Sequence, residues 1–392
     1  MIGLFTFDGP IYCDINGIYC STTITNQMLR RYLTVVDKLY VAIRTFHIND
    51  TYQSTHLQKV SDDQIEIIEL PNLNTPKNFI FNSQARKILE TYVARCDLFF
   101  LRIPSIISNI TATLCRKAHK PYLVEVGGCA WDSYFHHGIL GKLVAPAMFN
   151  SQRRTVRKAT FATYVTQQWL QHRYPTPAIQ VVASNVYLQS FDESVLRSRI
   201  DKVSQSGYKP YKLGTIASVD VRYKGQDLII RALGRLKREG YNFEYYLVGA
   251  GDPTHLFSLA AKCGVRERVH HLGVKLHKEI FEWLDQIDIY AQPSRQEGLP
   301  RSVIEAMNRA CICIGSDTAG IPELLDDAFI FKSGNVGQIC RVLKYVYRYS
   351  DYTSIAKTNF ERSKKFSVTK LDNIRETIYQ EYKAYLDSST KQ

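Results

Sequence analysis

The chain has 392 residues, of which 45% are hydrophobic and 22% charged, and this balance excludes wholesale disorder. Its length is too great for one ordinary domain and fits two, each with room for a full hydrophobic core. The formal net charge of +13 favours anionic partners, and nucleic acid, an anionic membrane surface and phosphorylated substrates all fit that charge.

Cysteines and apolar runs indicate a reducing, aqueous compartment. The nine cysteines form no CxxC pair, and the closest two, Cys311 and Cys313, fall in a predicted strand. We expect them to be reduced core residues, not disulfides or metal ligands. No apolar run is long enough to cross a bilayer, and the start MIGLFTFDGP lacks a basic region followed by a long apolar core. The sequence therefore predicts a cytoplasmic protein.

The first half of the chain alternates predicted strands with predicted helices. Near-continuously apolar strands separated by amphipathic helices predict an α/β domain with a parallel, doubly wound sheet. We assign residues 1–190 to this domain. The strands are predicted at 2–7, 39–45, 65–70, 98–103, 122–128, 161–166 and 179–184, and helices at 22–36, 78–95 and 105–117.

Two loops of this domain follow strand ends, where α/β sheets bind ligands. In the loop 8–21, Gly17 would let the backbone approach a phosphate, and a plain turn glycine is the alternative interpretation. In the segment 124–138, Asp132 is the candidate for touching sugar or acceptor hydroxyls, unless it caps the next helix. Behind it on the acceptor side we place Glu125, His136 and His137.

The segment 138–158 combines an apolar helical face with a basic end. Such a combination fits docking on an anionic membrane leaflet, and a core helix with a solvated basic end is the alternative. The apolar residues are Leu140, Leu143, Val144, Ala147 and Met148, and the basic ones are Arg153, Arg154, Arg157 and Lys158.

A polar stretch at 189–209 leads to a second series of strands, each followed by a helical pattern. This series predicts a second parallel-sheet domain over 210–365, and an amphipathic helix follows at about 370–388. The strands are predicted at 213–218, 243–249, 269–273, 288–293, 311–315 and 329–331.

The segment 292–323, QPSRQEGLPRSVIEAMNRACICIGSDTAGIPE, sets two carboxylates on either side of a predicted helix start. Gly298 stops any upstream helix and Pro300 suits a first helical position, so Glu297 lies in the loop and Glu305 one turn into the helix. The first-turn amides of a helix bind phosphate. A diphosphate there would have one glutamate on each side, with Glu305 placed for ribose hydroxyls and Glu297 for a sugar ring. The alternative interpretation is that Glu297 and Glu305 are solvated charges without a ligand.

This motif, EGLPRSVIEAM after a strand, resembles the two glutamates seven residues apart in retaining glycosyltransferases of the GT-B fold, most closely glycosyltransferase family 4. The resemblance is strong over 213–323 and looser before. It implies two Rossmann-like domains facing a central cleft, for acceptor and nucleotide sugar, with the last helix crossing back to the first domain. It also implies retaining, hexosyltransferase-type chemistry without a metal, because no DxD motif occurs and the helix terminus and basic side chains replace the metal's charge.

Lys224, before Gly225 at the mouth of a strand–helix unit, matches the diphosphate lysine of the family, which neutralises the leaving group. A solvated surface lysine is the alternative. The family usually has an arginine where this chain has Ser218, and Arg222 is the nearest replacement.

The resemblance implies further donor contacts, and one family residue is missing. Gly249 and Gly251 either shape a turn or admit the nucleotide, and the backbone near Val274 faces the base. The first-domain histidine of many members is replaced by Gly127 and Gly128. The remaining donor-binding positions are Gly298, Leu299 and Pro300.

We therefore expect a glycosyltransferase that moves a sugar to a glycan or lipid-linked glycan acceptor in surface polysaccharide biosynthesis, making capsule, O-antigen or exopolysaccharide. Its expected location is the cytoplasm, peripheral at the inner face of the membrane. Another GT-B enzyme, such as a sugar-nucleotide epimerase or a phosphorylase, is the first alternative. A nonenzymatic nucleic-acid binder is the second, but the basic residues are spread over both domains without a nucleic-acid motif, so we expect no nucleic acid.

Overall fold

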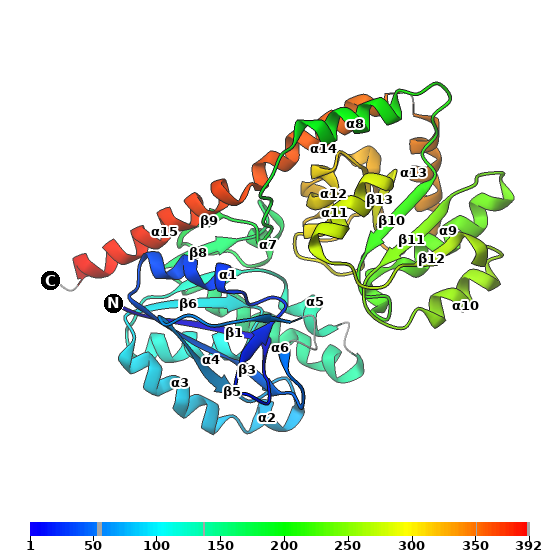
Figure 1. The fold of residues 1–392 in the computed structure, drawn as a ribbon. Helices are drawn as coiled ribbons and strands as arrows, with labels where there is room; N and C mark the ends of the chain where they lie inside the picture. The colour runs from blue at the N-terminus through cyan, green and yellow to red at the C-terminus, as the bar shows by residue number, and fades with distance from the viewer. Residues whose placement is uncertain (53–56, 136–137, 350, 390–392) are drawn as a thin grey trace. The chain divides into compact units, whose positions relative to one another are not determined.

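The computed structural model describes residues 1–52, 57–135, 138–349 and 351–389, which form two compact units (Figure 1). Unit 1 comprises Met1–Ala183 and Leu371–Gln392, and unit 2 comprises Ser184–Lys370. The chain therefore passes from unit 1 to unit 2 and back again.

The stretch 189–209, expected as a polar connection, is part of unit 2. It contains α8 (Glu193–Val203), whose first turn is capped by the side chain of Asp192. The buried side chain of Arg199 donates hydrogen bonds to two backbone carbonyl oxygens within 284–287. These bonds fix the helix to the rest of unit 2.

Unit 1 is built on a parallel sheet with the strand order β5-β3-β1-β6-β7-β8-β9. All seven predicted strands are present. The strands are β1 (Ile2–Cys13), β3 (Lys38–His47), β5 (Ile65–Leu70), β6 (Leu98–Ile103), β7 (Leu123–Val126), β8 (Phe161–Tyr164) and β9 (Ile179–Val182). The expected loop 8–21 instead extends β1 and forms an antiparallel hairpin with β2 (Tyr19–Ser21), to which β4 (Gln58–Lys59) adds.

Helices cover both faces of this sheet (Figure 1). The predicted helix 22–36 is a short α1 (Asn26–Arg30) followed by the 3-10 turn η1 (Arg31–Thr34), and the predicted helix 78–95 is split into α2 (Pro76–Ile80) and α3 (Ser83–Arg95). On one face lie α3 (Ser83–Arg95), α4 (Ile106–Lys117) and α6 (Gly138–Arg157), and on the other lie α1 (Asn26–Arg30), η1 (Arg31–Thr34) and α15 (Val368–Ser389). The remaining short helices are α2 (Pro76–Ile80), α5 (Ala130–Phe135) and α7 (Trp169–Arg173).

Unit 2 has a six-stranded parallel sheet with the strand order β12-β11-β10-β13-β14-β15. The chain begins in the middle at β10, moves outward to β12 and returns to β13, so the strand order reverses between β10 and β13. In open α/β sheets, ligands bind beyond the carboxyl ends of the strands at such a switch point. The strands are β10 (Lys212–Ile216), β11 (Glu244–Val248), β12 (Val269–His271), β13 (Ile289–Gln292), β14 (Ile312–Ser316) and β15 (Ile330–Phe331).

The helices of unit 2 pack in two groups. The first group is α9 (Gln226–Arg238), α10 (Thr254–Lys262) and α13 (Val336–Arg348), and the second is α8 with α11 (His277–Gln286), α12 (Arg301–Asn308) and α14 (Tyr352–Ser363). Within the described residues of both units, no helix combines the length and the apolar character needed to span a bilayer.

The long last helix, α15, completes the core of unit 1, as predicted. Its residues Ile378, Tyr379 and Tyr382 are fully buried and pack against the sheet residues Phe100 and Phe161. Burying a large apolar side chain contributes about 1.5–3 kcal/mol relative to leaving it exposed, so these three contacts bind the helix firmly to unit 1.

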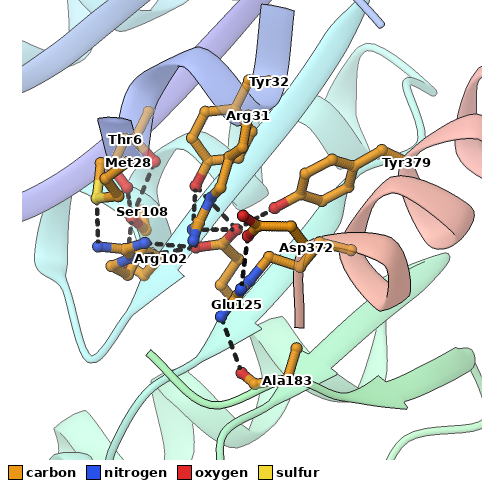
Figure 2. A network of polar contacts seen from close by, with 11 residues as sticks. Thr6, Met28, Arg31, Tyr32, Arg102, Ser108, Glu125, Ala183, Asp372 and Tyr379 are labelled. Atoms are coloured by element: carbon orange, nitrogen blue, oxygen red, sulfur yellow. Dashed lines mark hydrogen bonds and ion pairs between the residues drawn. The ribbon is translucent and has the colours of Figure 1, made fainter. Parts of the chain in front are cut away.

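The carboxylate of Glu125, on β7, lies at the centre of a buried polar network in this core (Figure 2). The guanidinium groups of Arg31 and Arg102 lie 2.9 and 3.0 Å from its Oε2. The hydroxyls of Tyr32 and Tyr379 each donate to its Oε1 at 2.8 Å. Protein donors therefore occupy both oxygens of the carboxylate.

The prediction that Glu125 faces an acceptor is therefore wrong. Helices cover both faces of β7, so all four of its residues are buried, and the side chain of Glu125 joins η1, β6, β7 and α15. Burial alone raises the pKa of this carboxyl, but the two arginines and the two tyrosine hydroxyls lower it to about 2. The charge of Glu125 holds the core together.

We predict that Glu125→Gln destabilises unit 1 by about 3–5 kcal/mol, because breaking a buried ion pair leaves the two arginines without their counter-charge. The folded-state pKa lies below the ordinary value of 4.5, so the carboxylate contributes its full stability above pH 4.5 and loses it as the pH falls toward 2. Urea unfolding at pH 7, 4 and 3 measures both effects.

The matched control is Glu66→Gln, which breaks an exposed ion pair with Lys38 and should change stability little. If Glu125→Gln is as stable as the wild type at pH 7, the network does not hold the core.

Candidate active site

Two loops of unit 2 meet at the switch point of its sheet. The loop 217–225 follows β10 and the loop 293–300 follows β13. Gly225 has a φ of 77°, and a Cβ atom placed on it would lie 2.1 Å from the carbonyl oxygen of Pro293. Only glycine permits both this conformation and this close approach.

Arg295 fastens the two loops together. Its backbone amide donates to the carbonyl oxygen of Tyr223 at 2.7 Å, and its guanidinium donates to the carbonyl oxygen of Arg222 at 2.8 Å. The same guanidinium binds both carboxylate oxygens of Asp227 at 3.0 Å. A bidentate pair of this kind fixes orientation as well as distance.

The contact between the two loops brings Lys224 beside Glu297, although the two residues are 73 positions apart in the sequence. The Nζ of Lys224 lies 2.8 Å from Oε1 of Glu297, and the two side chains are 25% and 10% exposed. The Nε2 of Gln292 donates to the same oxygen at 2.8 Å. Across the described residues, Oε2 of Glu297 has no hydrogen-bond partner, and this contact uses one of the three N–H donors of Lys224. Both charged groups therefore keep capacity for a ligand.

Gln292, at the end of β13, is a residue of this site that the sequence did not reveal. It is 2% exposed, and its Oε1 accepts hydrogen bonds from Tyr290 Oη at 2.8 Å and Ser302 Oγ at 3.2 Å. Its amide nitrogen donates to Ser294 as well as to Glu297. The side chain thus joins the strand, the loop and the first turn of α12. The one sequence signal that could have identified Gln292 is that a polar residue ends an otherwise apolar strand.

The helix α12 begins at Arg301, as predicted, and Pro300 is its N-cap residue and not its first helical residue. No side chain among the described residues caps its first turn, so the positive end of the helix remains available to an anion. The carbonyl oxygen of Gly298 accepts the amide of Gly320 at 2.9 Å, which holds the loop in front of the helix. Leu299, between these positions, is half-buried.

Glu305 lies one turn into α12, with its side chain 15% exposed. Its Oε1 is 3.8 Å from Nε2 of His277, the first residue of α11, and the carboxylate raises the pKa of this histidine. The two glutamates therefore flank the helix start from the loop and from the helix itself, as the motif predicted.

The other predicted donor residues follow the carboxyl ends of β10, β11 and β12, and their exposures differ. Gly249 and Gly251 have φ values of 150° and 110°, and a Cβ on Gly249 would lie 2.2 Å from the carbonyl oxygen of Ala217. Packing between the loops after β10 and β11 therefore requires glycine there, with or without a nucleotide. Arg222 is exposed, and Val274, beyond β12, is 55% exposed.

The candidate residues of unit 1 lie in separate elements. Gly17 has a φ of 74° at the tip of the β1–β2 hairpin, which accounts for a glycine without a ligand. Asp132 is half-buried in the first turn of α5, close after the end of β7, where its charge complements the helix terminus. His136 and His137 lie outside the described residues.

The helix α6 carries exposed apolar residues at its start and an exposed basic cluster at its end. Ile139, Leu140 and Leu143 are 81%, 66% and 72% exposed, whereas Met148 is buried. The predicted apolar face is therefore divided between core and surface. The exposed basic residues are Arg153, Arg154, Arg157 and Lys158.

Comparisons with known proteins agree with this geometry. A family model described as glycosyl transferases group 1 matches residues 210–348. Protein CapJ of Staphylococcus aureus is 29% identical over 378 residues, which cover 95% of this chain and 92% of CapJ. The amylovoran biosynthesis glycosyltransferase AmsK of Erwinia amylovora is 31% identical over 132 residues, or 32% of each chain.

Among solved structures, HepE of Anabaena in complex with UDP aligns over 97% of this chain and 99% of its own. The TM-score is 0.64 at 17% identity, so the likeness is one of fold. The segment 210–348 contains both glutamates and Lys224, and this segment matches the glycosyl transferases group 1 family, glycosyltransferase family 4, while the chain as a whole has the GT-B fold.

Proposed function

We propose that the chain is a retaining glycosyltransferase and that unit 2 binds its nucleotide-sugar donor. The observation that carries this proposal is the Lys224–Glu297 pair at the switch point, beside the uncapped start of α12. A cation, free helix amides and a carboxylate with one unpaired oxygen are the groups that a sugar diphosphate requires.

In the proposed mechanism, the bond between the sugar and the diphosphate breaks while negative charge grows on the diphosphate. The two remaining N–H donors of Lys224 and the first-turn amides of α12 stabilise that charge, so the transfer proceeds without a metal. The Oε2 of Glu297 accepts a sugar hydroxyl, and its negative charge stabilises the oxocarbenium character of the ring. The acceptor attacks from the same face, and the departing phosphate takes its proton.

The donor in this proposal is a uridine diphosphate sugar. The similarity to HepE, whose solved structure contains UDP, supports this choice of nucleotide. Glu305 accepts hydrogen bonds from the ribose hydroxyls, and the exposed backbone at Val274 contacts the base. Arg222 is exposed in η3 (Arg222–Lys224) and supplies a second phosphate contact in place of the arginine missing at Ser218.

The proposed acceptor is a glycan or a polyprenyl-linked glycan of surface polysaccharide biosynthesis. The relationship to AmsK, a glycosyltransferase of amylovoran biosynthesis, supports an acceptor of this class. Asp132 is the proposed contact for the acceptor or sugar hydroxyls in unit 1. The exposed apolar start and basic end of α6 fit a lipid-linked acceptor at an anionic membrane surface.

A screen of nucleotide sugars by thermal stabilisation tests the proposed donor. A donor present at a hundred times its dissociation constant adds about 2.7 kcal/mol of stability, and we expect this from a uridine diphosphate sugar. Analysis of the products separates the alternatives, since an epimerase alters the nucleotide sugar without any acceptor and a phosphorylase consumes inorganic phosphate. Failure of every nucleotide sugar to stabilise the protein would oppose the proposal.

The two glutamates should give different kinetic defects. Glu297→Gln removes the charge that stabilises the transition state, so we expect kcat to fall by about 10²–10³-fold while the donor still binds. Glu305→Gln weakens ribose binding, so we expect KM for the donor to rise with a smaller change in kcat. Glu282→Gln, at an exposed site on α11, is the control and should behave as wild type. Wild-type kcat in Glu297→Gln would exclude its assigned role.

Membrane docking through α6 predicts salt-sensitive binding to anionic vesicles. The double variant Arg153→Glu/Arg157→Glu should bind at least about tenfold more weakly, because each basic residue near an anionic surface contributes about 1 kcal/mol. Lys262→Glu/Lys278→Glu, which changes exposed lysines of unit 2 by the same charge, is the control. Equal binding of both double variants, or full activity on free sugars without vesicles, would count against membrane docking.

A further inference from the structure

We propose that Cys13, His47 and Glu69 in unit 1 bind a zinc ion. The thiol sulphur, a ring nitrogen and a carboxylate oxygen of these residues all lie within 4.8 Å of one another. The site is independent of the proposed transfer reaction, whose donor residues lie in unit 2. It also revises the expectation that all nine cysteines are core residues without a metal.

Three neighbouring strands bring the three ligands together. Cys13 is the last residue of β1 and pairs in register with His47, the last residue of β3, so both side chains project on the same face of the sheet. Glu69 lies on β5, the next strand along. The residues preceding the pair, Tyr12 and Phe46, stack with each other, as residues one position along a strand do on the opposite face.

The distances suit a tetrahedral ion. With metal–ligand bonds of about 2.1 Å, two nitrogen or oxygen ligands of a tetrahedron lie about 3.4 Å apart. The Nε2 of His47 lies 3.1 Å from Oε2 of Glu69, so a small adjustment admits the ion. A thiolate with an imidazole and a carboxylate favours zinc, because magnesium and calcium prefer oxygen ligands alone.

A neighbouring hydroxyl supports the carboxylate. Tyr19 Oη donates to Oε1 of Glu69 at 2.9 Å, which fixes the side chain and leaves Oε2 directed to the ion. Such outer contacts orient the ligands of metal sites. An ion pair alone explains the contact of His47 with Glu69, but it does not explain a thiol placed against the same carboxylate.

One side of the proposed zinc site is open to solvent. The side chains of His47 and Glu69 are 67% and 38% exposed, whereas Cys13 is buried. The ion therefore reaches its ligands from solvent, with a fourth position left for water, as at zinc sites with three protein ligands. Bound zinc would join the β1–β2 hairpin to β3 and β5.

Zinc and cobalt titrations of the full-length, metal-free protein test this proposal. We expect one equivalent of zinc to bind in competition with a chromophoric chelator, and cobalt to give the near-ultraviolet absorption of a cobalt–thiolate bond. Cys13→Ser should abolish that absorption. His47→Ala changes an exposed side chain, so it should fold normally and bind zinc at least about tenfold more weakly. Tyr19→Phe should keep the absorption and weaken binding by about 10–100-fold.

Cys263→Ser and His255→Ala, in unit 2, are the matched controls and should titrate as wild type. The proposal is overturned if the wild type binds no stoichiometric zinc, or if Cys13→Ser and His47→Ala bind it as tightly as the controls do. Neither readout uses sugar transfer, so failure here leaves the proposed glycosyltransferase activity untouched.

Discussion

The site in unit 2 depends on one ion pair across the switch point of its sheet, between Lys224 and Glu297. Strand order makes the pair possible, because β10 and β13 are neighbours although three strand–helix connections lie between them. Glycine at 225 then lets the two loops touch. The carboxylate is nine-tenths buried, and a buried charge is tolerated only with partners. Lys224 supplies that partner from a distant part of the chain.

Hydrogen-bond capacity distinguishes two glutamates of this protein, the structural Glu125 and Glu297, for which we propose a role in sugar transfer. Glu125 has both oxygens occupied by arginine and tyrosine donors, so it serves the core. Glu297 has one oxygen held by Lys224 and Gln292, while the other is unpaired across the described residues. Fixing one oxygen orients the other before a ligand arrives, and such preorganisation is what makes electrostatic stabilisation effective. Burial alone would not distinguish these two residues.

Local chemistry made much of the molecule predictable, and contacts between distant segments made the rest unpredictable. Apolar runs identified the parallel strands of both sheets but not the short antiparallel strands β2 and β4, and Pro300 identified the start of α12. The motif also placed both glutamates correctly around that start. Nothing near Glu125 in the sequence reveals that arginines from two other elements contact its carboxylate. Gln292 was missed for the same reason, since its partners become visible only when strand, loop and helix are assembled.

The return of the chain to unit 1 has a consequence for biosynthesis. Residues 184–370 form a continuous unit that contains all of its own strands, so all the residues of this unit are made before Tyr379 and Tyr382 of α15. The N-terminal part, although made first, lacks Tyr379 and Tyr382 until the residues of α15 have been made, after the whole of unit 2. Its buried arginines and Glu125 therefore lack one hydroxyl partner until then, and unit 1, although begun first, is completed after unit 2.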